Sequence, residues 1–230
     1  MKVIAVVPIK LNNQRLPNKN IKKFTNGKPL CHYILSTLLE LDGISEVCVF
    51  CSSEEIKKYL PEGITFVQRS KELDSDATKM NDILKAFALI KPADCYIMTH
   101  ATAPFISANS IKRGLNAFLS GEYDSAFSVK LLQDFLWRNN RPLNYDLDCI
   151  PRTQDLEPIA EETSGFYIYN YDTICDLNRR IGQKPYLVEV SEIEAVDIDE
   201  PEDFVIADAI FNFVYCNKEG ECGNESNTNS

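Results

Sequence analysis

The chain has 230 residues, a formal net charge of −10 at pH 7 and eight cysteines. This acidic balance argues against nucleic acid as the main partner, because a surface that binds phosphate polymers is normally basic overall. No apolar run reaches about 18 residues and the apolar opening is short, so we expect neither a membrane span nor a signal peptide. Cys48 and Cys51 have no second pair that would complete a zinc site, and we therefore expect reduced thiols and a cytoplasmic location.

Short apolar runs alternate with segments of helical spacing along most of the chain. Uninterrupted apolar runs predict strands at residues 3–8, 46–51, 64–68, 95–99, 125–129, 165–169 and 186–190. Apolar residues at helical spacing predict helices at 30–41, 54–60, 76–90, from a cap at Ser107 or Asn109 to Leu119, and at 201–214. This alternation predicts an α/β fold, a three-layer, Rossmann-like arrangement with a mostly parallel sheet between helices.

One stretch breaks this rhythm. Residues 132–163 are rich in Asn, Pro and charge and show no clean period, so we interpret them as an excursion from the core, useful as a lid or a subunit contact. We find no linker that divides the rest, and residues 1–215 are expected to form a single domain. The polar residues 216–230 are predicted to be a disordered tail.

The loop after the first predicted strand concentrates positive charge. Seven Lys or Arg precede residue 29, whereas no Asp or Glu occurs before Glu40. Ligands of α/β sheets bind at the carboxyl ends of the strands, but without a Gly before Gly27 this loop is neither a Walker A sequence nor a dinucleotide fingerprint. A polyphosphate would have to be held by side chains; the alternative is a solvated basic loop. The candidate phosphate ligands are Lys10, Arg15 and Lys19, and Asn12, Asn13 and Gln14 add neutral donors.

A pair of acids near the end of the chain is the second candidate feature. In an extended segment Asp197 and Asp199 point to the same side, where two carboxylates repel by roughly 4 kcal/mol at an effective dielectric of about 20. A hard cation such as Mg²⁺ relieves that repulsion, with substrate phosphates completing its shell. The alternative is a helix start, with Asp199 as N-cap and Glu202 at the third helical position. Together, the basic loop and the acid pair resemble the two halves of a magnesium–nucleoside triphosphate site.

Five segments, in order, resemble the cytidylyltransferases that make CMP-activated acidic sugars. The segment VPIKLNNQRLPNKN is similar to the family's opening motif, and its matching positions are Pro8, Arg15, Leu16, Pro17 and Lys19. The other similar segments are QRSKELDSDAT (68–78), HATAPFIS (100–107), TSGFYIYN (163–170) and VDIDEPEDF (196–204). The resemblance extends over residues 2–210 and implies a nucleotide-diphospho-sugar transferase type of fold with a protruding dimerisation segment.

The resemblance also implies an activity, in which the acceptor's hydroxyl attacks the α-phosphorus of CTP and pyrophosphate leaves, supplying a surface polysaccharide pathway. It implies Mg²⁺ as the cofactor, held by Asp197 and Asp199, and a homodimer. The implied catalytic residues are Arg15, Lys19 and Asp199. The implied nucleotide ligands are Lys10, Asn13, Arg15, Lys19, Arg69, Ser75 and Asp76.

The acceptor half resembles the family less closely. The implied acceptor-binding residues are His100, Thr102, Arg152, Gln154 and Ser164. Glu161, Glu162 and Ser164 stand where the family often places an Arg for the acceptor's carboxylate. Because a Glu there would repel an acid, we expect an acceptor other than ordinary N-acetylneuraminate. His100 either contacts the acceptor, acts as a base or is structural. The alternatives that stay open are a nucleotidyltransferase for another acceptor, such as a phosphonate, and a catalytically inactive nucleotide-binding relative.

Overall fold

The protein is described by a computed structural model of residues 1–216. The tail predicted at 216–230 lies outside the described residues, apart from its first position. The strands are β1 (Val3–Ile9), β2 (Glu46–Cys51), β3 (Ile64–Gln68), β4 (Cys95–Thr99), β5 (Ser125–Leu132), β6 (Trp137–Arg138), β7 (Arg141–Pro142), β8 (Ile159–Asn170) and β9 (Pro185–Glu189). The α-helices are α1 (Leu30–Leu39), α2 (Met80–Ile90), α3 (Ala108–Leu119), α4 (Tyr171–Cys175) and α5 (Pro201–Phe211).

Seven strands form one central sheet in the order β3-β2-β1-β4-β8-β5-β9. Every pairing is parallel except those of β8, which runs antiparallel to both β4 and β5. The prediction of an α/β fold with a mostly parallel sheet is therefore confirmed. The chain reverses its direction of travel across the sheet between β1 and β4, and such a switch point opens a crevice at the carboxyl ends of the strands.

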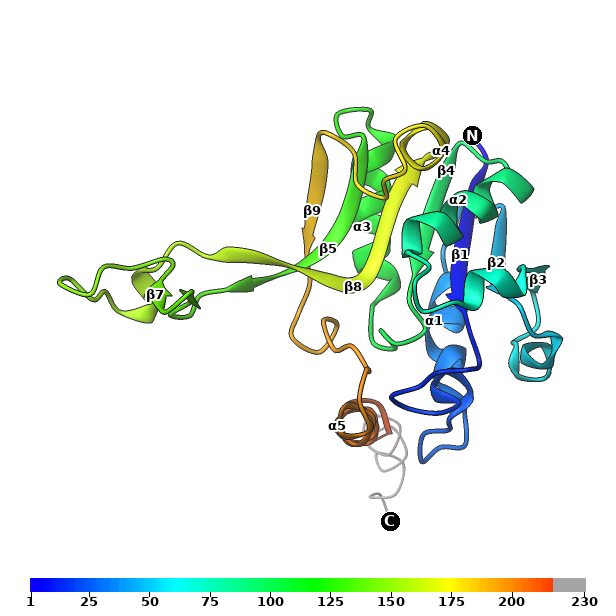
Figure 1. Ribbon diagram of the computed structural model, residues 1–230, viewed down its shortest axis with the longest axis horizontal. Coiled ribbons are helices and arrows are strands. Elements are labelled where there is room, and N and C mark those ends of the chain that lie inside the picture. Colours follow the sequence, from blue (N-terminus) through cyan, green and yellow to red (C-terminus); the bar gives the residue numbers. More distant parts are fainter. Residues whose placement is uncertain (217–230) are drawn as a thin grey trace, which may run out of the picture.

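Helices cover both faces of this sheet (Figure 1). On one face, Ile34 and Leu38 of α1 and Ile111 of α3 pack against alternate residues of β1, β2 and β4. On the other face, Phe87 of α2 and Ile174 of α4 pack against the opposite set of strand residues. The central strands are buried on both sides, which explains why each appears in the sequence as an uninterrupted apolar run.

Helix α5 packs beside the loop that follows β1. The ring of Phe204 lies 5.0 Å from that of Phe24, and the ammonium of Lys22 lies 4.4 Å over the Phe204 ring. Leu16 of the loop and Ile198, just before the helix, belong to the same small apolar cluster. This cluster fastens the cationic loop to the acidic segment, although more than 170 residues separate them in the chain.

Several helix boundaries differ from the prediction, and the helix predicted at 54–60 is a 3-10 helix, Glu54–Tyr59. The helix predicted from residue 76 begins at Met80, because Asp76 is engaged by side chains of the β1 loop and residues 75–79 form a turn. The N-cap of α5 is Glu200 and its capping partner is Asp203, one residue beyond the predicted pair of Asp199 and Glu202. The predicted final helix ends at Phe211, and residues 212–216 form a π turn.

The irregular stretch at 132–163 is more ordered than predicted. Strands β5 and β8 run past the edge of the sheet as a two-stranded ribbon, pairing from Val129 with Glu162 to Leu132 with Ile159. Together with the short β6–β7 hairpin they form an arm, residues 131–160, that projects sideways from the body (Figure 1). A ribbon without a core face has no apolar period, which explains why the sequence pattern failed there.

Candidate active site

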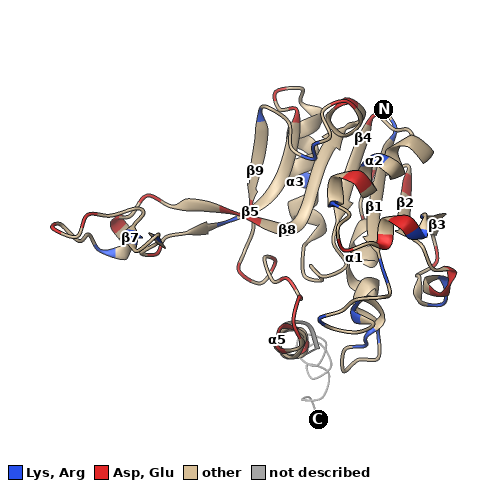
Figure 2. Cartoon of the chain, viewed as in Figure 1, with Lys and Arg blue, Asp and Glu red and all other residues tan. Residues whose placement is uncertain are grey.

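A cavity of about 390 Å³ opens at the carboxyl ends of the strands, at the switch point of the sheet. Segments that follow β1, β3, β4 and β9 meet around it, and β8 contributes one wall. Eleven of the fourteen predicted site residues line it: Lys10, Asn13, Lys19, Arg69, Ser75, Asp76, His100, Thr102, Ser164, Asp197 and Asp199. Arg15, Arg152 and Gln154 lie outside that lining. Figure 2 shows the two charged features on the fold, with blue Lys and Arg in the loop after β1 and red Asp and Glu ahead of α5.

Lys19 links the cationic loop to the acidic segment. It opens a short 3-10 helix (Lys19–Ile21), which Asn18 introduces in the left-handed conformation at φ 57°. The Lys19 ammonium donates to the carbonyl oxygen of Ile198 at 2.7 Å and to Oδ1 of Asp199 at 3.0 Å. With 8% of its surface exposed, Lys19 is one of the most buried charged residues in the described part of the chain. Because an ammonium has three donors, one remains for a ligand.

Arg15 lies at the rim of the cavity. Its guanidinium contacts Oδ2 of Asp199 at 3.1 Å and donates to Oε1 of Glu200 at 2.9 Å. Both oxygens of Asp199 are therefore occupied by cations. Burial raises the pKa of Asp199, but the hydrogen bond and charge of Lys19, followed by the charge of Arg15, outweigh burial and hold that pKa below its ordinary value.

Lys10 and Gln14 contact the loop before α2. The Lys10 ammonium contacts Oδ1 of Asp76 at 3.0 Å, and the amide of Gln14 donates to the other oxygen of Asp76. The backbone carbonyl of Lys10 accepts from the buried Asn20, which sequence reasoning missed and which also lines the cavity. Oδ1 of Asn13 is buried without a partner. An exposed ion pair such as Lys10–Asp76 is weak, so an incoming polyphosphate can displace it.

Arg69 contributes the floor of the cavity. Its side chain is 2% exposed, donates to Oδ1 of Asp74 at 2.6 Å and lies 5.9 Å from the ring of Phe50. Its Nε has no partner. The neighbouring Ser75 lines the same cavity. Arg69 thus anchors the loop after β3 and leaves one buried donor without a hydrogen bond.

The acid pair lies on an extended segment that a backbone hydrogen bond ties to the loop after β4. Ile198 is fully buried and its N–H donates to the carbonyl of Thr102 at 2.9 Å, so the flanking Asp197 and Asp199 both face the cavity. Oδ1 of Asp197 is buried and has no hydrogen-bond partner, a costly state for a carboxylate oxygen unless a ligand fills it. Within residues 1–216 no cluster of three or more potential metal ligands occurs. A magnesium ion here would therefore rest on these two acids and on oxygens of the substrate, a set that Mg²⁺ accepts.

The acceptor side of the cavity carries His100, Thr102 and Ser164. Burial lowers the pKa of His100 to about 4 despite the opposing charge of Asp197, so the imidazole is neutral at pH 7. Arg152 and Gln154 lie on the arm instead, where Arg152 pairs with Asp155 at 2.7 Å. Within the described residues 1–216, neither residue lines the cavity.

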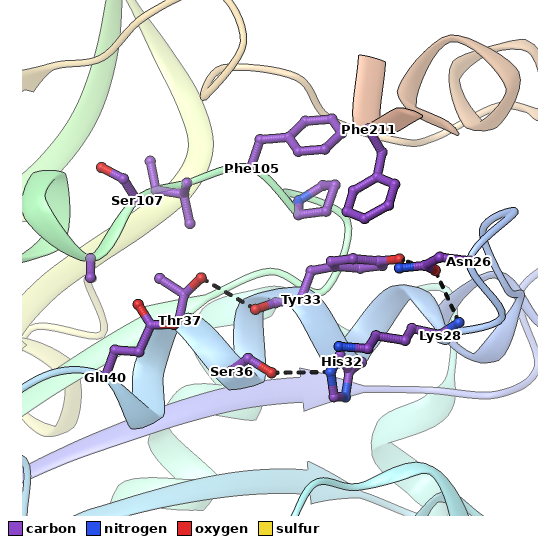
Figure 3. Close-up of a pocket in the computed structure, with 13 residues that line it drawn as sticks. Asn26, Lys28, His32, Tyr33, Ser36, Thr37, Glu40, Phe105, Ser107 and Phe211 are labelled. Atoms are coloured by element: carbon purple, nitrogen blue, oxygen red, sulfur yellow. Dashed lines mark hydrogen bonds between the residues drawn. The ribbon is translucent and has the colours of Figure 1, made fainter. Parts of the chain in front are cut away.

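A larger cavity, of about 650 Å³, lies between α1, the loop after β4 and the end of α5 (Figure 3). His32 and Lys28 border it on one side, and Phe105 and Phe211 on the other. His32 contacts Ser36 at 3.3 Å, and burial, aided by the charge of Lys28, lowers its pKa. This cavity contains none of the predicted site residues and no pair of carboxylates. Size alone therefore does not identify the functional site.

None of the helices within residues 1–216 is long and apolar enough to cross a membrane. The fold and the smaller cavity together define an α/β domain in which a cationic loop and an acid pair face one crevice, as a nucleotide-binding domain requires. A family model described as cytidylyltransferase matches residues 4–215, and the chain belongs to that family.

Individual relatives are distant in sequence. The chain is 24% identical to an N-acylneuraminate cytidylyltransferase of Streptococcus agalactiae serotype V, over 96% of this chain and 56% of that protein. It is 25% identical to a pseudaminic acid cytidylyltransferase of Campylobacter jejuni, over 73% of this chain and 78% of the relative. The structure of CMP:2-keto-3-deoxy-manno-octonic acid synthetase complexed with CTP superposes with a TM-score of 0.71 at 15% identity, covering 93% of this chain and all of the other. That likeness supports the fold, and the chain spans about half the length of the first curated relatives it matches.

Proposed function

We propose that this chain is a magnesium-dependent cytidylyltransferase that transfers CMP from CTP to an acidic sugar of the nonulosonate kind, for the synthesis of a surface polysaccharide. The observation that carries the proposal is the meeting of Lys10 and Lys19 with Asp197 and Asp199 around one cavity at the switch point of the sheet. Membership of the cytidylyltransferase family supports CTP as the nucleotide. Sugar acids are supported by the names of the relatives.

The residues divide the reaction between charge neutralisation and positioning. The acceptor's hydroxyl oxygen forms a bond to the α-phosphorus of CTP, the bond to pyrophosphate breaks, and the hydroxyl proton is released. Lys10 and Lys19 offset the negative charge that develops on pyrophosphate, and Arg15 adds to them from the rim. Bound at Asp197 and Asp199, Mg²⁺ supplies Lewis acidity toward the phosphate oxygens.

The remaining predicted residues orient the two substrates. Arg69 and Ser75, with Asp76 freed from Lys10, border the space for the cytidine. The neutral imidazole of His100 accepts a hydrogen bond from the acceptor, and Thr102 and Ser164 supply hydroxyl groups beside it.

The arm is proposed to complete the site of a second copy. It exposes large apolar side chains that a lone chain leaves in water: Phe135, Trp137, Leu143, Leu147 and Ile150. Such a surface is typical of a subunit contact. In a homodimer, Arg152 and Gln154 would reach the partner's cavity from the arm. The cytoplasmic location stays a prediction, supported by six cysteines that form no disulfide: Cys31, Cys48, Cys51, Cys95, Cys149 and Cys175.

Pyrophosphate release tests the proposal. Purified protein is incubated with each of the four nucleoside triphosphates and with N-acetylneuraminate, 3-deoxy-manno-octulosonate or a phosphonate, with Mg²⁺ or with EDTA. We expect release with CTP and a sugar acid only, and none in EDTA. Asp197→Asn should reduce release at least 100-fold, whereas Asp42→Asn, an exposed acid far from the cavity, should leave it unchanged.

Each contrary result has a definite meaning. Release with the phosphonate alone would replace the proposed acceptor class. No release with any pair of substrates, together with intact binding of CTP, would identify a catalytically inactive relative and overturn the proposed activity.

A further inference from the structure

A second concavity of similar size adjoins the active-site cavity on its acceptor side. It has a volume of about 420 Å³, and Met80 lines both cavities. Three cations border it, Lys79, Arg179 and Arg180, against the single carboxylate of Glu162. Glu162 comes from the same strand as Ser164, which lines the active-site cavity.

Of these cations, Arg180 is held by contacts with Glu162 and Tyr167. Its guanidinium lies 4.1 Å over the ring of Tyr167, and its Nη2 donates to Oε1 of Glu162 at 2.9 Å and to the Tyr167 hydroxyl at 3.2 Å. Both hydrogen bonds of the side chain use the same nitrogen, so within residues 1–216 Nη1 and Nε have no protein partner. Stacking fixes the plane of the guanidinium, and Nη1 and Nε remain as donors that can each bind a carboxylate oxygen beside the positive charge.

The loop that carries Arg180 is held firmly in place. The carboxylate of Asp124 accepts from the N–H groups of Gln183 and Lys184, and Asn81 of α2 donates to the carbonyl of Asn178. A Cβ at Gly182 would collide with the carboxylate of Asp124, so this close approach requires glycine. The side chain of Arg180 is therefore presented by a fixed backbone, as a recognition group needs to be.

The two glutamates of β8 do not make this region repulsive to acids. Glu162 is neutralised by Arg180 and hydrogen-bonded to Tyr167. Glu161 is exposed and pairs with Lys130 of β5 at 3.2 Å. A bulge in β8 between its pairings with Val129 and Phe127 shifts the register there. The positive charge that the family motif leads one to expect is therefore supplied here by Arg180, from the loop between α4 and β9.

We infer that Arg180 recognises the carboxylate of the acceptor, with Arg179 and Lys79 adding to the positive potential, so that this chain selects its acidic substrate through the loop between α4 and β9. This inference rests on the proposed function and adds to it a specificity-determining residue. It also removes the reason to exclude N-acetylneuraminate, since the glutamate at the site is already paired.

The test measures binding and turnover separately. Binding of N-acetylneuraminate and of 3-deoxy-manno-octulosonate is followed by saturation-transfer NMR in the presence of CTP without Mg²⁺, and pyrophosphate release gives KM where turnover occurs. Arg180→Gln should weaken binding of the acid, or raise its KM, by about 10- to 100-fold, with the KM for CTP unchanged. The methyl ester of each acid should bind wild type and variant equally. Lys112→Gln, an exposed change of the same charge on α3, serves as control.

A purely structural role for Arg180 makes a different prediction. If Arg180 served only to neutralise Glu162, then Arg180→Gln combined with Glu162→Gln would recover wild-type binding. We expect no recovery, and we expect Glu162→Gln alone to bind the acid at least as tightly as wild type, because it frees Nη2. Equal binding by wild type and Arg180→Gln, including no binding by either, would overturn the inference. Normal binding of acids without pyrophosphate release would instead count against the proposed activity alone.

Discussion

Replacing Lys19 by Met removes the cation that joins the two halves of the site and keeps the length of the side chain. The ammonium donates to the buried carbonyl of Ile198 at 2.7 Å and to Asp199 at 3.0 Å. A buried hydrogen bond that involves a charged group contributes about 1.5–3 kcal/mol. The Asp199 carboxylate is 45% exposed, so its ion pair adds only about 0.2–1 kcal/mol. We therefore expect Lys19→Met to lower the free energy of unfolding by about 2–4 kcal/mol.

Chemical denaturation followed by circular dichroism measures this loss. Lys23→Met is the matched control, because Lys23 lies in the same loop, carries the same charge and is exposed, and it should change the free energy of unfolding by less than about 0.5 kcal/mol. In the pyrophosphate assay Lys19→Met should lose at least about 100-fold in kcat. If Lys19→Met and Lys23→Met were equally stable and equally active, the buried contact of Lys19 would contribute nothing to stability, and its proposed role would be refuted.

Three further predictions concern the core, the pH dependence and the arm. Gly114→Ala places a Cβ 2.8 Å from the ring of Phe166, so it should lower the free energy of unfolding by about 1–3 kcal/mol in urea titration; an unchanged value would show that the ring moves freely. Burial raises the pKa of Glu194, but hydrogen bonds from Ser107 and Ser110 outweigh it and hold that pKa below its ordinary value. The carboxylate therefore stabilises the fold above the ordinary glutamate pKa, and this contribution is lost as the pH falls through the lowered pKa. Glu194→Gln should flatten that part of the stability profile, and parallel profiles would contradict the assignment. Trp137→Ser should shift the protein toward monomer in size-exclusion chromatography with light scattering, and an unchanged mass would remove the arm from the dimer contact.

The fold was predictable where burial is uniform. Strands β2 and β4 occupy the predicted residues, because a strand buried on both faces must be apolar throughout. Strand β3 also occupies its predicted residues, although at the sheet edge only Val67 is buried. Helix α4 was missed, since five residues are too few to show a helical period. The arm was missed as ordered structure for a different reason: its ribbon has two exposed faces, and neither requires an apolar pattern.

The site was predictable where local chemistry is unusual and unpredictable where the contact is long-range. A loop without acids and a pair of aspartates stand out in any acidic sequence, and both line the same cavity. Arg180 has no such signal, because an arginine in a polar loop is ordinary until the fold brings it to Glu162. At the motif position of the family's cation, this sequence has a glutamate, Glu162. The cation that neutralises it, Arg180, lies 18 residues further along the chain, outside the motif.

The ion pairs of this cavity also explain how its cations are stabilised before a polyanion binds. Lys10 is paired with Asp76, and Lys19 and Arg15 are paired with Asp199, so the cations are not left to repel one another. Under the proposed function, a triphosphate would take Lys10, Lys19 and Arg15 as its partners, and Mg²⁺ would be held by Asp197 and Asp199. Pairing with carboxylates offsets the mutual repulsion of these cations before a polyanion binds. We therefore expect that removing the acidic residues of the site also weakens the binding of triphosphate. Likewise, removing the basic residues should also weaken the binding of Mg²⁺.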